Sequence, residues 1–156
     1  MRIYLPSTLA ELAVKGGLSP RRVHAVTPAL RSALPDEDEE GLEYAAQLLA
    51  ADDSLERLDG TTPTGRRRVV VAADVPEAVV DSVEDDEAHA PSAVQLTTSV
   101  GWDSVACAHV DEPAAERDVV AALGGDDSAM ERLSERDLLW YDASELERLA
   151  AKAAKS

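Results

Sequence analysis

Cys107, His109 and Asp111 have the residue types and spacing that come closest to a reactive site in this sequence. Residues 104–110 are predicted to form a strand, and residues two apart on a strand share a face. A thiol, an imidazole and a carboxylate on one face would suit a Cys–His pair or metal ligands. Such neighbours lie about 6.5 Å apart, however, and a nucleophile needs its base within about 3 Å. A buried, hydrophobic Cys107 and an Asp111 that caps a helix starting at Pro113 are the simpler interpretation.

A second candidate site, for a small molecule, combines Tyr4, Arg68, His109 and Asp111. Ligands of open α/β sheets bind beyond the carboxyl ends of the strands, where Tyr4, His109 and Asp111 are expected. Arg68 begins its strand and fits this arrangement less well. The hypothesis describes a small-molecule sensor or an enzyme.

The compact motifs of common enzyme classes are missing from the sequence. Its eight glycines form neither a phosphate-binding loop nor a dinucleotide fingerprint, and there is no metalloprotease helix or serine nucleophile elbow. The sequence therefore favours a protein that is not an enzyme, and it predicts no cofactor. Enzymes without these motifs stay open as an alternative.

Two acidic segments resemble cation sites. Residues 36–41 are like the first half of an EF-hand loop, but Gln47 occupies the twelfth position, which must supply a bidentate carboxylate. The dipole at a helix start explains these acids more simply. Residues 84–89 contain four acids and His89, which gives a third hypothesis of weak divalent-cation binding. Like charges on a flexible loop lack a preorganised geometry, so no metal site is predicted.

Trp140 and Tyr141 concentrate aromatic surface in a chain with no Phe, two Trp and three Tyr. The preceding leucines favour a place in the core. An exposed pair would instead be an interface anchor. Arg66 to Arg68 form the one dense basic patch, which is typical of protection at a strand end. The patch could also hold an anionic ligand or an acidic surface of a second copy.

The net charge is −16, from 31 acidic and 15 basic residues. Such a surface repels nucleic acid and anionic membranes, so neither is expected as a partner. It attracts cations or a basic protein, although acidity can equally serve solubility or adaptation to high salt.

The chain's location is predicted from its cysteine content and its apolar pattern. One cysteine excludes an intramolecular disulfide, no apolar run is long enough to span a bilayer, and the first residues lack a signal-peptide pattern. These features predict a cytoplasmic protein.

The order of predicted elements gives an α/β to α+β fold with one domain over residues 1–156. Strands and helices alternate at the start, which predicts βαβ units within a mixed sheet of five or six strands. Residues 93–99 and 104–110 are expected to pair as a hairpin around Gly101. The unbroken run 69–73 is typical of a central strand covered on both faces.

Amphipathic helices are expected to pack on this sheet, with a long one near 37–58 and a C-terminal one near 144–155. The buried stripe of the long helix is predicted to hold Tyr44, Leu48, Ala51, Leu55 and Leu58. Loops at 59–65, 84–92 and 124–128 are predicted to be mobile.

Six segments in this order resemble a family of small acidic actinobacterial proteins of unknown function. The segments are RIYLP at 2–6, HAVTPAL at 24–30, LEYAA at 42–46, RVVVAADVP at 68–76, HVD at 109–111 and LLWY at 138–141. The resemblance implies a stand-alone cytoplasmic protein and supplies no catalytic residues.

The leading hypothesis is a non-catalytic interaction or regulatory protein. It would act through a basic protein partner or as a homo-oligomer.

Overall fold

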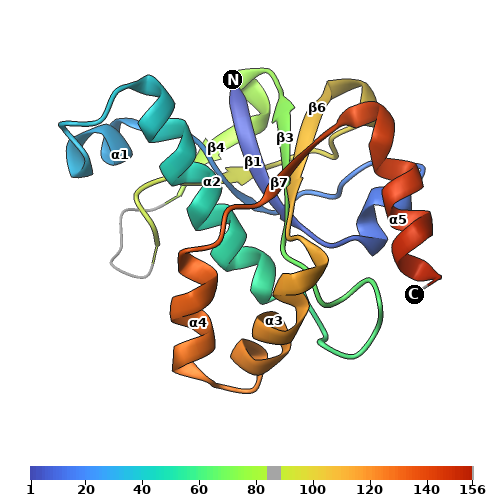
Figure 1. Cartoon of the computed structure of the whole chain (residues 1–156). Coiled ribbons are helices and arrows are strands. Elements are labelled where there is room, and N and C mark those ends of the chain that lie inside the picture. The colour runs from blue at the N-terminus through green and yellow to red at the C-terminus, as the bar shows by residue number, and fades with distance from the viewer. Residues whose placement is uncertain (84–88, 156) are drawn as a thin grey trace.

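The computed structural model describes residues 1–83 and 89–155, and in them a seven-stranded sheet is flanked by helices (Figure 1). The strands are β1 Arg2–Ser7, β2 Arg22–His24, β3 Val69–Asp74, β4 Val80–Ser82, β5 Ala93–Leu96, β6 Val105–Val110 and β7 Leu139–Asp142. The α-helices are α1 Pro28–Ala33, α2 Glu39–Leu55, α3 Glu116–Leu123, α4 Asp127–Ser134 and α5 Leu146–Ala154. Short 3-10 helices are η1 Ala10–Ala13, η2 Glu77–Val79, η3 Trp102–Ser104, η4 Pro113–Ala115 and η5 Ala143–Glu145. The α/β class with a single domain is confirmed.

The sheet has the order β4-β5-β2-β1-β3-β6-β7, and every neighbouring pair of these strands is antiparallel. The predicted opening βαβ unit is therefore wrong, and the strands number seven rather than five or six. A parallel crossover needs a helix long enough to return along the strand. Between β1 and β2 only the four-residue η1 forms, so the chain turns back beside β1.

The expected hairpin of residues 93–99 and 104–110 is also wrong, because three strands separate β5 from β6. The backbone of Val100 bonds with Leu18 in both directions, at 2.8 and 2.9 Å. The indole of Trp102 donates to the carbonyl of Val14 at 2.6 Å. These bonds lead the chain across one face of the sheet from β5 to β6.

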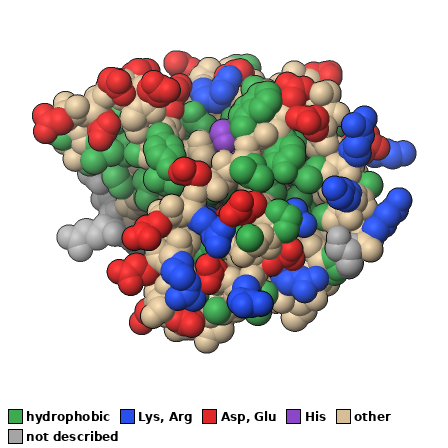
Figure 2. Space-filling model, viewed as in Figure 1, with side chains coloured by type: hydrophobic (Ala, Val, Ile, Leu, Met, Phe, Trp, Pro, Cys, Tyr) green, Lys and Arg blue, Asp and Glu red, His purple; other side chains and the backbone are tan. Residues whose placement is uncertain are grey.

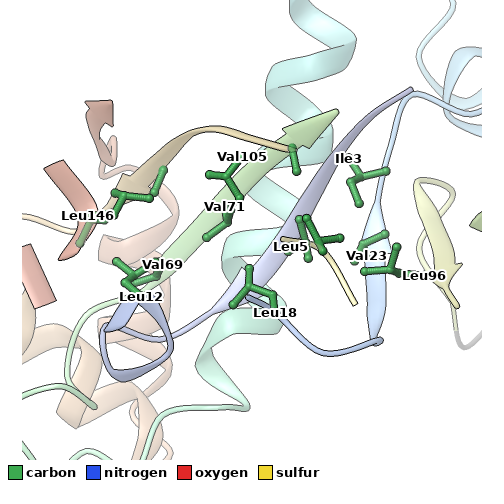
Figure 3. Packing of buried hydrophobic residues seen from close by; sticks show 14 of the residues in the cluster. Ile3, Leu5, Leu12, Leu18, Val23, Val69, Val71, Leu96, Val105 and Leu146 are labelled. Carbon is green, nitrogen blue, oxygen red and sulfur yellow. The ribbon is translucent and has the colours of Figure 1, made fainter. Parts of the chain in front are cut away.

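The strand β3 is the centre of the fold, as its β-branched run predicted. Val69 to Ala73 are all buried, and neighbouring side chains point to opposite faces. Val69 and Val71 join a large cluster on the face that carries η1 and α5 (Figure 3). Val70 joins the cluster beneath α2 on the other face.

The helix α2 begins where the acidic run predicted a start, with the Asp38 carboxylate accepting from the Gly41 N–H at 2.8 Å. It ends at Leu55, three residues before the predicted end, because the backbone tightens into a 3-10 turn. Its buried stripe contains Leu42, Ala46 and Ala50, while Tyr44 is 44% exposed. Of the predicted stripe, Ala51, Leu55 and Leu58 are buried as expected, whereas Tyr44 is exposed and Leu48 is only half-buried.

The helices α3 and α4 pack together near the C-terminal end of α2, around Leu55 and Leu133 (Figure 1). They are joined through the segment 124–128, where Asp126 caps α4 by accepting from two backbone N–H groups. In the segment 59–65, the Asp59 carboxylate accepts from the N–H groups of Thr61 and Thr62. The mobility of both loops stays a prediction, and residues 84–88 of the third loop lie outside the described residues.

No helix in residues 1–83 and 89–155 is long and apolar enough to cross a membrane.

Candidate functional site

The antiparallel register places Tyr4, Cys107, His109 and Trp140 on the sheet face that carries α2. Tyr4 pairs with Ala72, which pairs in turn with Cys107, and His109 pairs with Trp140. Residues that pair directly across antiparallel strands share a face. The sheet therefore brings Tyr4 and His109 to one side, as the small-molecule hypothesis required.

Cys107 and His109 lie closer together than strand spacing predicts, with Sγ and Nε2 3.8 Å apart. The imidazole leans along the strand towards the thiol, so the expected separation of about 6.5 Å was wrong, but 3.8 Å is still longer than the distance of about 3 Å that a nucleophile and its base need. The chemistry still does not resemble an activated nucleophile. Burial raises the pKa of the Cys107 thiol, and burial together with the nearby Arg2 lowers the pKa of His109. Both groups are held neutral, whereas a reactive pair needs a thiolate.

Arg68 and Asp111 are brought together, but as a buried ion pair. Both side chains are at most 2% exposed, and Arg68 donates from Nε and Nη2 to the two Asp111 oxygens at 2.8 Å. The Arg68 backbone N–H adds a bond of 2.9 Å to the same carboxylate. Asp111 therefore joins the start of β3 to the end of β6 instead of capping a helix. The pair's main hydrogen-bonding groups are directed at each other rather than at a ligand.

Tyr4 is 5% exposed beneath α2. Burial, with a contribution from the negative charge of Glu43, raises the pKa of its phenol to about 12. Tyr4 is thus a neutral core residue at physiological pH.

Trp140 and Tyr141 point to opposite faces of β7. Tyr141 is half-buried against the cluster that includes Leu146. Trp140 is 60% exposed on the α2 side, and the neighbouring Leu139 is 43% exposed. Figure 2 shows hydrophobic side chains gathered on this face, with acidic side chains over α1 and a mixture of acidic and basic ones over α3 and α4. The aromatic pair is split between the core and the surface.

A Ser–His–Asp chain of hydrogen bonds was missed by the sequence analysis. Nδ1 of His24 lies 2.6 Å from Ser92 Oγ, and Nε2 lies 2.6 Å from Asp53 Oδ2. Ser92 is fully buried and His24 is 1% exposed, so a substrate cannot reach the hydroxyl. The three residues tie the residue that precedes β5 to β2 and α2. No local motif could have revealed them, because they lie 29 and 68 positions apart.

Two hollows lie elsewhere on the described surface. The larger has a volume of about 1080 Å³, between the start of α1 and β4, and its lining includes Thr27, Val80 and Asp81. The smaller has a volume of about 650 Å³ and is lined by Arg66, Arg117 and Arg136 among others. Neither contains Tyr4, Arg68, His109 or Asp111.

Residues 1–150 match the model of a family of unknown function, DUF6912. The chain belongs to this family. The match runs from β1 into α5, so it spans every strand of the described sheet. Comparisons with curated proteins and with solved structures found no match. DUF6912 membership assigns no chemistry to any residue, so function is argued from the surfaces themselves.

Proposed function

We propose that this chain is a non-catalytic interaction protein that binds an extended, basic segment of a partner protein along the outer edge of β7. The observation that carries the proposal is Trp140, a large aromatic side chain that is 60% exposed on a terminal strand of the described sheet. Aromatic side chains of this kind dominate the energetics of interfaces.

The two edges of the sheet differ in how they are protected. Natural proteins shield an edge with short strands and charges, since an unpaired strand can pair with another chain. The edge strand β4 follows that rule, with three residues and exposed Asp81 and Ser82. The edge strand β7 instead exposes Leu139 and Trp140. The β7 edge is therefore suited to being covered by a binding partner.

The backbone of β7 also presents hydrogen-bonding groups on its outer side, away from β6. The Asp142 N–H donates to Glu145 Oε2 at 2.8 Å, so it points away from the ladder with β6. Backbone groups two residues apart point to the same side of a strand. The N–H and C=O of Trp140 thus face outwards, where an added strand would pair.

Charge favours a basic partner over a second copy. Asp137 accepts from the Tyr44 hydroxyl at 2.7 Å beside the exposed apolar surface, and Asp142 ends β7. Two copies would each bring a net charge of −16 to the contact. A strand that alternates basic and apolar residues would instead meet opposite charges and cover Trp140. This partner would share the cytoplasmic location that the sequence predicts.

Calorimetry with a synthetic eight-residue peptide of alternating lysine and valine tests the proposal. We expect Trp140→Ser to weaken binding at least about tenfold, as loss of an aromatic anchor does. Met130→Ala is the matched control, because Met130 is an exposed hydrophobic residue on α4. Binding that both variants weaken equally, or no binding to the wild-type chain, would contradict the proposal.

Sedimentation of the chain alone distinguishes a basic partner from a second copy of the chain as the molecule that covers β7. We expect a monomer at all concentrations. A dimer that Trp140→Ser abolishes would overturn the basic partner and assign the β7 edge to a second copy.

A further inference from the structure

Arginines are concentrated around the N-terminal end of α3, although the chain as a whole is acidic. Five of its 15 basic residues lie there, and three of its 31 acidic residues make ion pairs with them. The basic residues are Arg66, Arg67, Arg117, Arg132 and Arg136, and the acidic ones are Glu112, Glu116 and Asp118. In Figure 2 several Lys and Arg side chains lie over this lower part of the molecule, with Asp and Glu side chains among them. Arginines are therefore denser here than in the chain as a whole, with carboxylates standing among them.

The three carboxylates are already committed to these arginines. Glu116 lies between Arg66 and Arg67, with one oxygen 3.6 Å from the Nε of each. Asp118 accepts from Arg132 Nε at 2.8 Å and lies 3.8 Å from Arg136. Glu112 accepts from Arg136. Glu116 and Asp118 themselves line the hollow, and each is also neutralised by an arginine that does not line it, Arg67 and Arg132 respectively.

Several guanidinium groups keep unused donors. Arg117 makes no hydrogen bond or ion pair with the residues that the structure describes, and it is exposed. The distances of 3.6 Å from Arg66 and Arg67 to Glu116 are too long for hydrogen bonds, and Arg66 Nε instead donates to the Thr62 carbonyl at 3.2 Å. The Nε of Arg67 is buried and has no hydrogen-bond partner within residues 1–83 and 89–155. Arg67 does not line the hollow, so its side chain contributes positive charge nearby and not a donor within it.

We propose that the hollow of about 650 Å³ lined by Arg66, Arg117 and Arg136, the arginine pocket, binds a phosphate group of a small molecule. A guanidinium group presents a planar fork of N–H donors that matches the oxygens of phosphate. The start of α3 adds the positive end of a helix dipole. The acidic remainder of the surface excludes long polyanions by repulsion, so a small ligand fits and a nucleic acid does not. This proposal is independent of the β7 edge.

Titration with inorganic phosphate, followed by amide NMR at constant ionic strength, tests the site. We expect saturable shifts confined to residues 113–118 and their neighbours. Phenyl phosphate serves as a second probe, and binding tighter than that of free phosphate would identify a phosphate ester as the preferred form.

Arg117→Gln is the decisive variant, because Arg117 has no partner among the described residues whose loss would unfold the chain. We expect it to weaken phosphate binding about tenfold, as loss of a charged hydrogen bond does. Arg148→Gln, an exposed arginine on α5, is the matched control and should bind as the wild type does. Absence of saturation up to about 10 mM phosphate, or equal weakening by both variants, would overturn the proposal.

Discussion

At the scale of single residues, the charged groups that attracted attention in the sequence are explained by their partners. Arg68 and Asp111 lie 43 positions apart, and each was a candidate for ligand binding. Their pairing in the interior accounts for both, because a buried charge requires an opposite charge and hydrogen bonds. The sequence identified the right residues, but it could not show that they face each other.

Asp111→Ala is expected to destabilise the fold by about 3–5 kcal/mol, because it leaves Arg68 charged and unpaired in the interior. Urea unfolding measures this loss. Asp74→Ala is the control, since it breaks a surface pair with Arg2 in which both side chains are well exposed, and should cost at most about 1 kcal/mol. Equal losses for the two variants would contradict the burial of the Arg68–Asp111 pair.

His109 is expected to titrate below its usual pKa of 6.5, because burial and then Arg2 disfavour its charged form. Below pH 6.5 the unfolded chain therefore binds a proton that the folded chain does not. The His109 contribution lowers stability as pH falls from 6.5 to the lowered pKa. NMR titration of the ring measures the pKa.

Arg2→Gln should raise the pKa of His109 only part of the way back, since burial is the larger cause. Arg148→Gln on the distant α5 should leave it unchanged. A wild-type pKa at or above 6.5 would contradict the half-buried position of His109.

At the scale of elements, the sequence predicted individual segments better than their pairing. The run 69–73 identified β3 as a strand covered on both faces, and the acidic cap located the start of α2. The antiparallel order depends on contacts between distant residues, such as the bridge from Leu18 to Val100. No local periodicity carries that information.

Gly17→Ala tests the turn that makes β1 and β2 antiparallel. Gly17 has φ of +88°, and a Cβ there would lie 2.1 Å from the carbonyl oxygen of Val100. We expect a loss of more than about 2 kcal/mol, measured by thermal or urea unfolding. Gly16→Ala is the neighbouring control, with no atom within 4 Å of the added Cβ, and should change stability by less than about 0.5 kcal/mol. Similar effects at both positions would contradict this geometry.

The strand β7 shows why interfaces are hard to predict from a sequence. The apolar run 138–141 is what a buried strand would have, and Leu138 is indeed buried. Whether Trp140 is covered depends on β7 lying at the edge of the sheet, beyond the reach of α2. That position is set by the whole topology, so both interpretations of Trp140 were open until the strand order was known.

At the scale of the whole molecule, charge is distributed unevenly over the surface. Acidic residues gather where α2 starts, as the helix dipole predicted, and arginines gather around α3. The total of −16 therefore hides a region rich in arginine, where acidic side chains are interspersed, and an apolar one (Figure 2). Composition alone could predict the sign of the average surface, but not the two surfaces on which the proposals rest.

Amide NMR of the chain with the alternating lysine–valine peptide tests the central claim, binding along β7, most directly. The account predicts that the largest chemical-shift changes fall on residues 138–142 and that the backbone N–H of Trp140 becomes protected from hydrogen exchange. The residues of the β4 edge should show no shift. Chemical-shift changes spread over all acidic surfaces, or a backbone N–H of Trp140 that still exchanges freely at saturation, would contradict binding along β7.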